Sequence, residues 1–390
     1  MPAVNPENQV ASLDIGDSQL ELSWHDGHVS RYPASWLLEA CDCDTCGDTR
    51  SAVRHTRLVD KPQRPAILIA THDTDSLRID WGNGHLSCYS LPWLRYHCLS
   101  PAGRAKRKFK PSCWGDEMAT NLPYMDYTEV AASDDLQLQF LESILHKGFA
   151  VLRGVPAARE HTEEITSLVG KLRLTNYEVY ELESKPVPEI VGDMSLALAP
   201  HTDEPYRVDP PAITFFHVIA QSRDGGASTL VDGFRLAQLL RQQEPEAFEI
   251  LSSISAGFHR HLREGRIFAY QHPIIQLDSD GDVTALRLLD RAMTPVDCKP
   301  DQVEPFYDAL RKLLRLSYSG EGMIEFRLEA GEMLVFNNQR LMHGRSAFDP
   351  ASGKRHIRSC HVDLDEFYSS LRILYAERED PRRWMTFRKD

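Results

Sequence analysis

Three side chains with the chemistry of metal ligands are spaced so that they could hold one transition metal. His201 and Asp203 are separated by a single residue, and His343 lies far downstream. In an extended segment, side chains at positions i and i+2 point to the same side, so an imidazole and a carboxylate can reach one ion. Two histidines and one carboxylate leave three octahedral positions open, as in non-heme Fe(II) oxygenases. The sequence therefore predicts an iron site, completed by His343 from a neighbouring strand.

Two arginines after His343 strengthen this prediction, because an H-x-D triplet by itself is usually only a hydrogen-bonded pair. They are Arg355 and Arg358. A dicarboxylate co-substrate needs a planar cation at its far end, and arginine binds a carboxylate through two parallel hydrogen bonds. The two arginines have opposite parity in an extended strand, so only one should face the site. We choose Arg355; the alternative is that both are surface arginines near a turn.

Cys41, Cys43 and Cys46 form a second group of metal-ligand type. The chain has eight cysteines and, at 390 residues, is too long to need disulfide staples. The C-x-C-x₂-C spacing is tighter than the usual zinc knuckle, but it favours a metal site over a disulfide framework.

An internal repeat surrounds these cysteines. LELSWHDGHVSRYPASWLLEAC, from Leu20, aligns with LRIDWGNGHLSCYSLPWLRYHC, from Leu77, at a constant offset of 57 residues. In each copy an alternating run precedes a DG or NG turn, which predicts a β-hairpin followed by a short helix. The two copies predict a small β-rich module with pseudo-symmetry. The basic stretch RAKRKFKP (104–111) that follows indicates a solvated linker.

The rest of the chain, from about Leu122, must supply the strands that carry the iron ligands. Helices are predicted over 136–148, over 234–253 and at the C-terminus. Strands are predicted within 149–156, 212–220, 228–233 and 354–362. The segment FRLEAGEMLVFNNQRLMHGRSAF (326–348) predicts a strand, a turn, a strand and a polar loop that carries His343. This pattern favours a closed or sandwiched β-structure with flanking helices over a βαβ repeat.

Composition and charge argue against several classes of function. The length predicts two or more domains. The formal net charge of −13 argues against binding to nucleic acid or acidic membranes, because an acidic surface repels phosphates. The N-terminus shows neither a signal-peptide nor a transit-peptide pattern, and no apolar run approaches the roughly 18 residues of a membrane span. We therefore expect a cytoplasmic protein with neither nucleic-acid nor membrane partners.

Four segments carry a resemblance to a known family. HTDEPY (201–206), GGASTLVDGF (225–234), NNQRLMHGRSAF (337–348) and RHIRSCHVDLDEF (355–367) resemble the γ-butyrobetaine hydroxylase and trimethyllysine hydroxylase family, whose wider group includes taurine dioxygenase. The CDCDTC segment with the later WGNGH is similar to the zinc-binding domain of that family. The resemblance implies a mainly β fold with flanking helices, and a homodimer. Its expected parts are a β-rich zinc domain (1–103), a linker (104–121) and a double-stranded β-helix, or jelly-roll, catalytic domain (122–390).

The resemblance also implies roles for individual residues. The iron ligands would be His201, Asp203 and His343, and the 5-carboxylate of 2-oxoglutarate would be bound by Arg355 and Ser228. A structural zinc would be held by Cys41, Cys43, Cys46 and His85, a closed tetrahedral set. His28, the repeat partner of His85, is the alternative fourth ligand.

The activity implied is that of an Fe(II)- and 2-oxoglutarate-dependent dioxygenase. Such an enzyme uses O₂ to convert 2-oxoglutarate to succinate and CO₂ and hydroxylates an unactivated C–H bond. In this family a cage of aromatic rings holds a trimethylammonium group. Tyr177 matches one cage position, whereas the other substrate positions depart from the family pattern and become Glu181, Asp193, Glu204 and His361.

These changes predict the charge of the substrate. The pocket gains carboxylates, and residues that would hold a substrate anion are replaced by Ile190 and by Leu288 or Leu289. We therefore expect a small cationic amine or quaternary ammonium compound, although Glu181 and Glu204 could instead be solvated surface acids. One alternative is a γ-butyrobetaine or trimethyllysine hydroxylase proper, which would act in carnitine biosynthesis. The other is an inactive zinc-binding scaffold.

Overall fold

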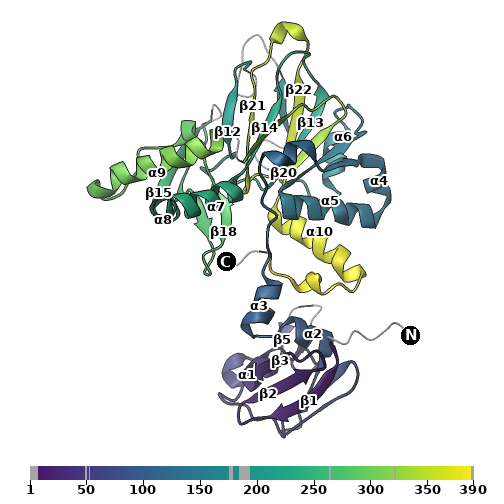
Figure 1. Ribbon diagram of the computed structural model, residues 1–390. Helices are drawn as coiled ribbons and strands as arrows, with labels where there is room; N and C mark the ends of the chain where they lie inside the picture. The colour runs from purple at the N-terminus through teal and green to yellow at the C-terminus, as the bar shows by residue number, and fades with distance from the viewer. Residues whose placement is uncertain are drawn as a thin grey trace. The chain divides into compact units, whose positions relative to one another are not determined.

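The computed structural model describes residues 8–48, 51, 53–174, 179–183, 194–262, 265–319 and 322–387. The chain divides into two compact units. Figure 1 colours the whole chain from purple at the N-terminus to yellow at the C-terminus. Unit 1 consists of Met1–Phe109 with Glu379–Thr386, and unit 2 consists of Lys110–Arg378 with Phe387–Asp390. None of the helices in the described part of the chain combines the length and hydrophobicity of a membrane span.

Unit 1 contains the predicted repeat. Each copy has the expected hairpin and short helix, preceded by one additional strand, so that two three-stranded antiparallel sheets result. The first copy is β1 (Val10–Ile15), β2 (Gln19–Trp24), β3 (Val29–Pro33) and α1 (Ala34–Glu39). The second copy is β6 (Ile69–His72), β7 (Ser76–Asp80), β8 (Leu86–Ser90) and α2 (Leu91–Tyr96), followed by α3 (Pro101–Arg107).

Equivalent bonds cross between the two copies. The hydroxyl of Tyr32 donates to the carbonyl of Leu94 at 2.6 Å, and the hydroxyl of Tyr89, its repeat partner, donates to the carbonyl of Leu37 at 2.5 Å. All four residues are buried in one hydrophobic core, to which both copies contribute. The two copies therefore form one module.

Unit 2 contains two larger sheets. A six-stranded sheet has the order β11-β22-β13-β20-β10-β9, and a four-stranded sheet has the order β12-β21-β14-β19. The strands of the first are β9 (Tyr124–Asp126), β10 (Phe149–Arg153), β11 (Tyr180–Glu183), β13 (Ile213–Ala220), β20 (Met333–Asn337) and β22 (His356–Val362). Those of the second are β12 (Leu198–His201), β14 (Ser228–Asp232), β19 (Met323–Phe326) and β21 (Leu341–Arg345).

The connections between these sheets define the fold. From β11 to β14, and again from β19 to β22, successive strands alternate between the two sheets. This alternation is the double-stranded β-helix, which confirms the predicted jelly-roll. The core strands are apolar on both faces, as the buried residues of β10 and β20 show.

Helices flank the six-stranded sheet, as predicted (Figure 1). The helix α5 (Asp134–Lys147) ends at Gly148, whose φ of 87° is the left-handed conformation that favours glycine at a helix end. It is accompanied by α4 (Tyr127–Ala132), α6 (His161–Thr166) and α10 (Leu364–Glu377).

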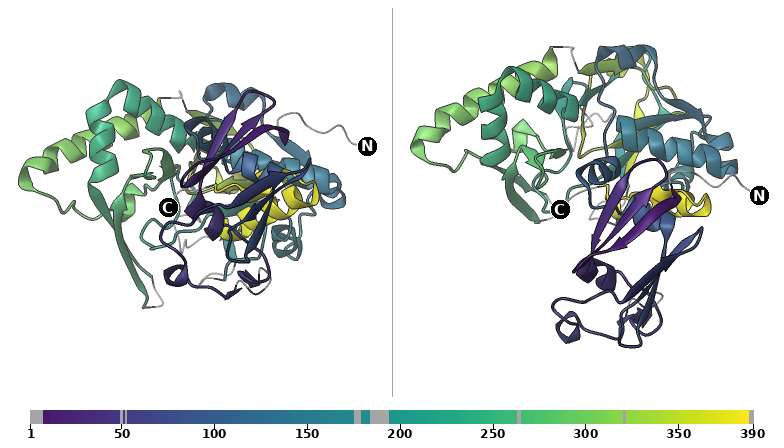
Figure 2. Two further views of the ribbon diagram at one scale, coloured as in Figure 1. Left: turned by 90° about the horizontal axis from the view of Figure 1, so that it is seen from below. Right: turned by 60° about the horizontal axis from the view of Figure 1, so that its bottom comes forward.

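A long insertion separates β14 from β19. The helical stretch predicted there is divided into α7 (Gly233–Gln243) and α8 (Pro245–Ser253), because Pro245 cannot continue a helix. The sequence analysis did not predict the strands that follow, β15 (Ser255–His261), β16 (Ile267–Pro273), β17 (Ile275–Leu277) and β18 (Val283–Leu286). The hairpin β15–β16 appears in Figure 2 (left) as a long green arm. The insertion ends with the short η5 (Asp290–Ala292) and the helix α9 (Pro300–Tyr318).

Candidate active site

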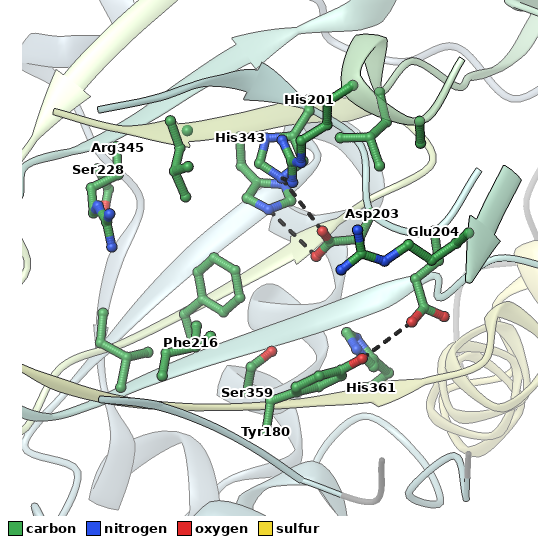
Figure 3. Close-up of a pocket in the computed structure, with 18 of the residues that line it drawn as sticks. Tyr180, His201, Asp203, Glu204, Phe216, Ser228, His343, Arg345, Ser359 and His361 are labelled. Carbon is green, nitrogen blue, oxygen red and sulfur yellow. Dashed lines mark hydrogen bonds and ion pairs between the residues drawn. The ribbon is translucent and has the colours of Figure 1, made fainter. Parts of the chain in front are cut away.

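His201, Asp203 and His343 converge in a pocket between the two sheets, with Ser228 and Arg345 to one side and Glu204 to the other (Figure 3). His201 ends β12 and pairs in register with His343 on the adjacent β21. The Nε2 atoms of His201 and His343 lie 3.5 and 3.4 Å from the two carboxylate oxygens of Asp203. The ligand atoms of the three residues all lie within 4.8 Å of one another. Three residues remote in the sequence can therefore bind one ion.

His343 comes from a strand next to that of His201, as expected from the spacing of the ligands. The segment pattern placed it in a polar loop, and in that respect it was wrong, because His343 is the central residue of β21. The polar segment before it is a tight turn, in which the N–H of Arg340 bonds to the carbonyl of Asn337 at 3.1 Å. Because a strand is more rigid than a loop, this placement fixes His343 more firmly against His201.

The protonation states of the triad suit a divalent cation. Burial would raise the pKa of Asp203, but His343 and His201 beside it lower that pKa below its ordinary value. Burial lowers the pKa of His343 to about 3, against the attraction of Asp203. Near neutral pH the site therefore offers an ionised carboxylate and a neutral imidazole, which are the forms that bind metals. The other nitrogen of His201, Nδ1, donates to the carbonyl of Ala199 at 2.8 Å and directs Nε2 into the site.

A basic group lies at a second part of the same pocket. Arg355 lines it and is only 5% exposed, and its Nε has no hydrogen-bond partner among the described residues. Burial, with a smaller effect of Arg345, lowers the pKa of Arg355 to about 9. Ser228 also lines the pocket, on β14. Arg358 lies on the other face of β22, where its guanidinium binds Glu163 at 3.0 Å.

Arg345 is a pocket residue that the sequence analysis missed. It is the register partner of Ser228 across β14 and β21, and Figure 3 shows the two side by side. Its Nη2 donates to the carbonyls of Met194 and Leu196 at 2.5 and 2.9 Å. The sequence contains a signal for Arg345, because a residue two positions after His343 on the same strand points to the same side of the sheet.

Glu204 and His361 line the opposite part of the pocket, as expected (Figure 3). Glu204 forms an ion pair with Arg207 and accepts a 3.3 Å hydrogen bond from the hydroxyl of Tyr180. Burial nevertheless raises the pKa of Glu204. Burial lowers the pKa of His361 to about 4, and its Nδ1 lies 3.1 Å from the hydroxyl of Thr214.

The structure corrects the placement of Glu181. Side chains alternate along β11, so Tyr180 and Leu182 line the pocket while Glu181 points to the opposite face. There Glu181 binds Arg358 at 2.9 Å and pairs with His356. Its carboxylate is thus part of a structural ion-pair cluster and does not contact a substrate in the pocket.

Other substrate predictions had mixed outcomes. Tyr177, Asp193 and Ile190 lie outside the described residues. Leu289 lines the pocket. The prediction that the pocket has lost groups able to hold an anion was wrong, because two further arginines, Arg260 and Arg291, line it as well. Both belong to the insertion, from which the sequence analysis expected only Leu288 or Leu289 at the site.

The second cluster of metal-ligand type lies in unit 1. The Nε2 of His85 is 3.5, 3.4 and 3.3 Å from the sulfur atoms of Cys41, Cys43 and Cys46. Burial and the other two sulfur atoms raise the pKa of Cys46 to about 12. Hydrogen bonds with Thr45 and His85 lower that of Cys43 to about 6, against the effect of burial.

The alternative ligand His28 lies elsewhere. Its Nε2 is 3.2 Å from the sulfur of Cys98, which is the repeat partner of Cys41. Each histidine of the repeat therefore faces a cysteine of the other copy, but only His85 meets three.

Comparisons with known proteins agree with this geometry. The family model described as taurine catabolism dioxygenase TauD, TfdA family matches residues 106–361, and the γ-butyrobetaine hydroxylase-like N-terminal model matches residues 12–95. The chain is 31% identical to a γ-butyrobetaine dioxygenase of Pseudomonas sp. (strain AK-1) over 96% of this chain and 97% of that protein. It is 30% identical to γ-butyrobetaine dioxygenase of Homo sapiens (94% and 97%) and 24% identical to trimethyllysine dioxygenase of Meyerozyma guilliermondii (96% and 98%). The chain belongs to the TauD/TfdA family and is an iron- and 2-oxoglutarate-dependent dioxygenase.

Proposed function

We propose that His201, Asp203 and His343 bind Fe(II) and that Arg355, with Ser228, binds the 5-carboxylate of 2-oxoglutarate. The observation that carries this assignment is the convergence of three ligand atoms within 4.8 Å in a pocket that also holds a buried arginine with an unsatisfied Nε. A carboxylate is the natural partner for such a guanidinium. Iron, when bound, supplies the oxidative chemistry that couples decarboxylation of 2-oxoglutarate to hydroxylation of a C–H bond.

The protein supplies orientation and shielding. The bond from His201 to the carbonyl of Ala199 fixes one imidazole, and the in-register partner His343 is fixed by β21. Phe216, Leu182 and Ile357 form an apolar wall of the pocket. Such a wall limits access of water to the reacting groups.

The proposed substrate is a small cationic amine or quaternary ammonium compound. Support comes from the relatives, which are named γ-butyrobetaine and trimethyllysine dioxygenases, and from two tyrosines in the pocket, Tyr180 and Tyr206, whose rings can attract a cation. Glu204 adds little, because Arg207 already neutralises it. A γ-butyrobetaine or trimethyllysine hydroxylase proper is the second candidate. The intact triad and Arg355 argue against an inactive scaffold.

A structural zinc on Cys41, Cys43, Cys46 and His85 belongs to the same proposal. Ligand atoms around one tetrahedral zinc, at bonds of about 2.0–2.3 Å, are separated by roughly 3.5 Å, which the three sulfur–nitrogen distances match. We accordingly propose a zinc-binding domain over 1–103, a linker over 104–121 and a catalytic domain over 122–390. The homodimer and the cytoplasmic location stay predictions.

The experiment that tests the enzyme proposal is a succinate assay. Iron-loaded protein is incubated with 2-oxoglutarate and O₂ and, in turn, γ-butyrobetaine, trimethyllysine and a panel of diamines. At least one compound is expected to raise succinate release tenfold or more over the background without substrate. His343→Ala is expected to abolish release with every compound. A wild-type protein that releases no succinate with any of them would favour the scaffold.

A further inference from the structure

The loop between β21 and β22 carries an aromatic residue that contacts two arginines of the pocket. Phe348 is only 6% exposed, and its ring centroid lies 4.9 Å from the guanidinium carbon of Arg345 and 5.5 Å from that of Arg355. Separations below about 6 Å are those of cation–π contacts. Both arginines line the pocket on the side of Ser228, whereas Phe348 does not line it (Figure 3). Phe348 can therefore affect a ligand in the pocket through the two arginines.

The two arginines are held in different ways. Nη2 of Arg345 donates to the carbonyls of Met194 and Leu196 at 2.5 and 2.9 Å. The side chain of Arg355 forms neither a hydrogen bond nor an ion pair with any residue that the structure describes. The position of its guanidinium is therefore determined by packing, and the ring of Phe348 is part of that packing.

The backbone around Phe348 is fixed by hydrogen bonds to two other segments. Phe348 forms an isolated β-bridge with Gly225, and its N–H donates to the carbonyl of Ser195 at 3.1 Å. The N–H of Gly226 donates to the carbonyl of Ala347 at 3.0 Å. The ring of Phe348 is thus carried by a loop that is tied down on both sides.

Two glycines permit the close approach of these segments. Gly225 and Gly226 have φ angles of 76° and 72°, the left-handed conformation that favours glycine. A Cβ on Gly225 would lie 2.2 Å from the carbonyl oxygen of Ala347, and one on Gly226 would lie 3.4 Å from Cβ of Phe348 and 3.6 Å from Nε of Arg355. The glycine pair therefore brings the segment before β14 against both Phe348 and Arg355.

We propose that Phe348 is a positioning residue that fixes the guanidinium of Arg355 and thereby selects the chain length of the 2-oxo dicarboxylic acid used as co-substrate. This inference rests on the proposed function and deepens it. One end of the co-substrate is assigned to the iron triad and the other to Arg355. When both ends are fixed, an acid that is longer by one methylene group cannot satisfy both. A binding group keeps such precision when packing locks its rotamer.

The test compares two ligands that differ by one methylene group, and it requires no turnover. Mn(II)-loaded protein is titrated calorimetrically with N-oxalylglycine, an analogue of 2-oxoglutarate, and with N-oxalyl-β-alanine, which is one methylene group longer. The wild type is expected to bind the shorter ligand about tenfold or more tightly, a usual effect of one methylene group in a close-fitting site. Phe348→Leu should bind N-oxalylglycine more weakly and lower the preference to about threefold or less, because Arg355 can then recede.

A second variant and a control separate this effect from a loss of packing. Phe348→Met keeps most of the side-chain volume without a ring, so it is expected to fold and to lose the preference as well. Phe248→Leu is the matched control. Phe248 is 7% exposed, and its ring centroid lies 4.0 Å from the guanidinium carbon of Arg241, but neither residue lines the pocket. This variant should keep the wild-type preference.

The outcomes distinguish this inference from the proposed function. A wild-type preference in Phe348→Leu and Phe348→Met, even with weaker binding of both ligands, would overturn the selection by Phe348. Equal binding of the two ligands by the wild type would overturn it too. Arg355→Gln tests the co-substrate assignment by itself: undiminished binding of N-oxalylglycine by this variant, or no binding of either ligand by the wild type, would refute that assignment and this inference together.

Discussion

Asn338 holds the backbone of Asp203 on both sides of the residue. Its Oδ1 accepts the N–H of Asp203 at 2.7 Å, and its amide nitrogen donates to the carbonyl of Asp203 at 3.1 Å. The same amide donates to the carbonyl of Pro211 at 2.9 Å, and the side chain is buried. Asn338 lies in the turn that leads into β21 and His343. One side chain thus joins two segments that carry iron ligands.

We expect Asn338→Ala to weaken iron binding by about 10- to 100-fold, the usual effect of removing a group that orients a metal ligand. The measurement is anaerobic calorimetry with Fe(II). Asn337→Ala is the control, because Oδ1 of Asn337 accepts from the N–H of Gln339 within the same turn and does not contact Asp203. Equal iron affinity in wild type and Asn338→Ala would show that Asp203 needs no such support.

Arg355→Lys should raise the KM for 2-oxoglutarate at least tenfold with a smaller effect on kcat. Lysine keeps the charge but cannot make two parallel bonds to a carboxylate. Initial rates of succinate release at varied 2-oxoglutarate provide the measurement. Arg358→Lys, on the opposite face of β22, should leave that KM unchanged although it disturbs the ion pairs with Glu163 and Glu181. Similar KM values for the two variants would contradict the assignment.

Cys43→Ser should remove bound zinc and destabilise unit 1. A closed site contributes its binding free energy directly to folding, so the loss of one ligand is costly. Metal analysis is expected to find one zinc per wild-type chain and far less in the variant, with a lower Tm. Cys88→Ser alters an exposed cysteine outside the cluster and should retain the metal. Zinc retained by Cys43→Ser would exclude Cys43 as a ligand.

Arg340 and Asp232 form a fully buried ion pair at 2.8 Å. Arg340 also donates to the carbonyls of His146 and Ser112. Arg340→Met should lower the free energy of unfolding by about 3–5 kcal/mol, because Asp232 would remain as an uncompensated buried charge. Adding Asp232→Asn should recover part of that loss in urea denaturation. A double variant that loses the sum of the two single effects would show that the charges do not interact.

His217 should make the protein sensitive to acid. It is fully buried, with Nδ1 2.8 Å from the hydroxyl of Thr162. Burial, and then Arg358, lower its pKa from the ordinary value of 6.5 to about 4. Between those values the unfolded chain binds more protons than the folded one, so stability falls as the pH decreases through this window.

The expected contribution of His217 between pH 7 and pH 5 is a loss of about 2 kcal/mol. Urea titrations at the two pH values give the measurement. His217→Gln is less stable at pH 7 but should lose less on acidification, because it lacks this titration. An identical loss in both proteins would assign the acid sensitivity to other groups.

Much of the fold follows from local patterns in the sequence. The alternating hairpins of unit 1, the apolar strands β10 and β13 and the glycine-terminated helix α5 each have a signal within about ten residues. The iron triad followed from the spacing of His201 and Asp203 and from the setting of His343. The structure agrees with these predictions because each depends on residues that are close together in the sequence.

The pocket residues that the sequence analysis misplaced or missed are positioned by features that no local sequence pattern contains. Glu181 was assigned to the pocket by alignment, but a shift of one residue along β11 reverses the face of every side chain. Arg260 and Arg291 reach the pocket only because the insertion folds back beside the sheets. Their contact with the site is long-range, and neither residue stands in a motif.

Residues of each copy of the repeat contact residues of the other copy, and this has a consequence for how the protein is synthesised. Cys41, Cys43 and Cys46 emerge from the ribosome well before His85, and Tyr32 must wait for Leu94. Until the second copy has been translated, the hydroxyl of Tyr32 has no Leu94 carbonyl to donate to, and the three thiols have no His85 imidazole beside them. Synthesis therefore passes through an interval in which the three cysteines lack the histidine that lies beside them in the folded module, and translation of the second copy ends that interval.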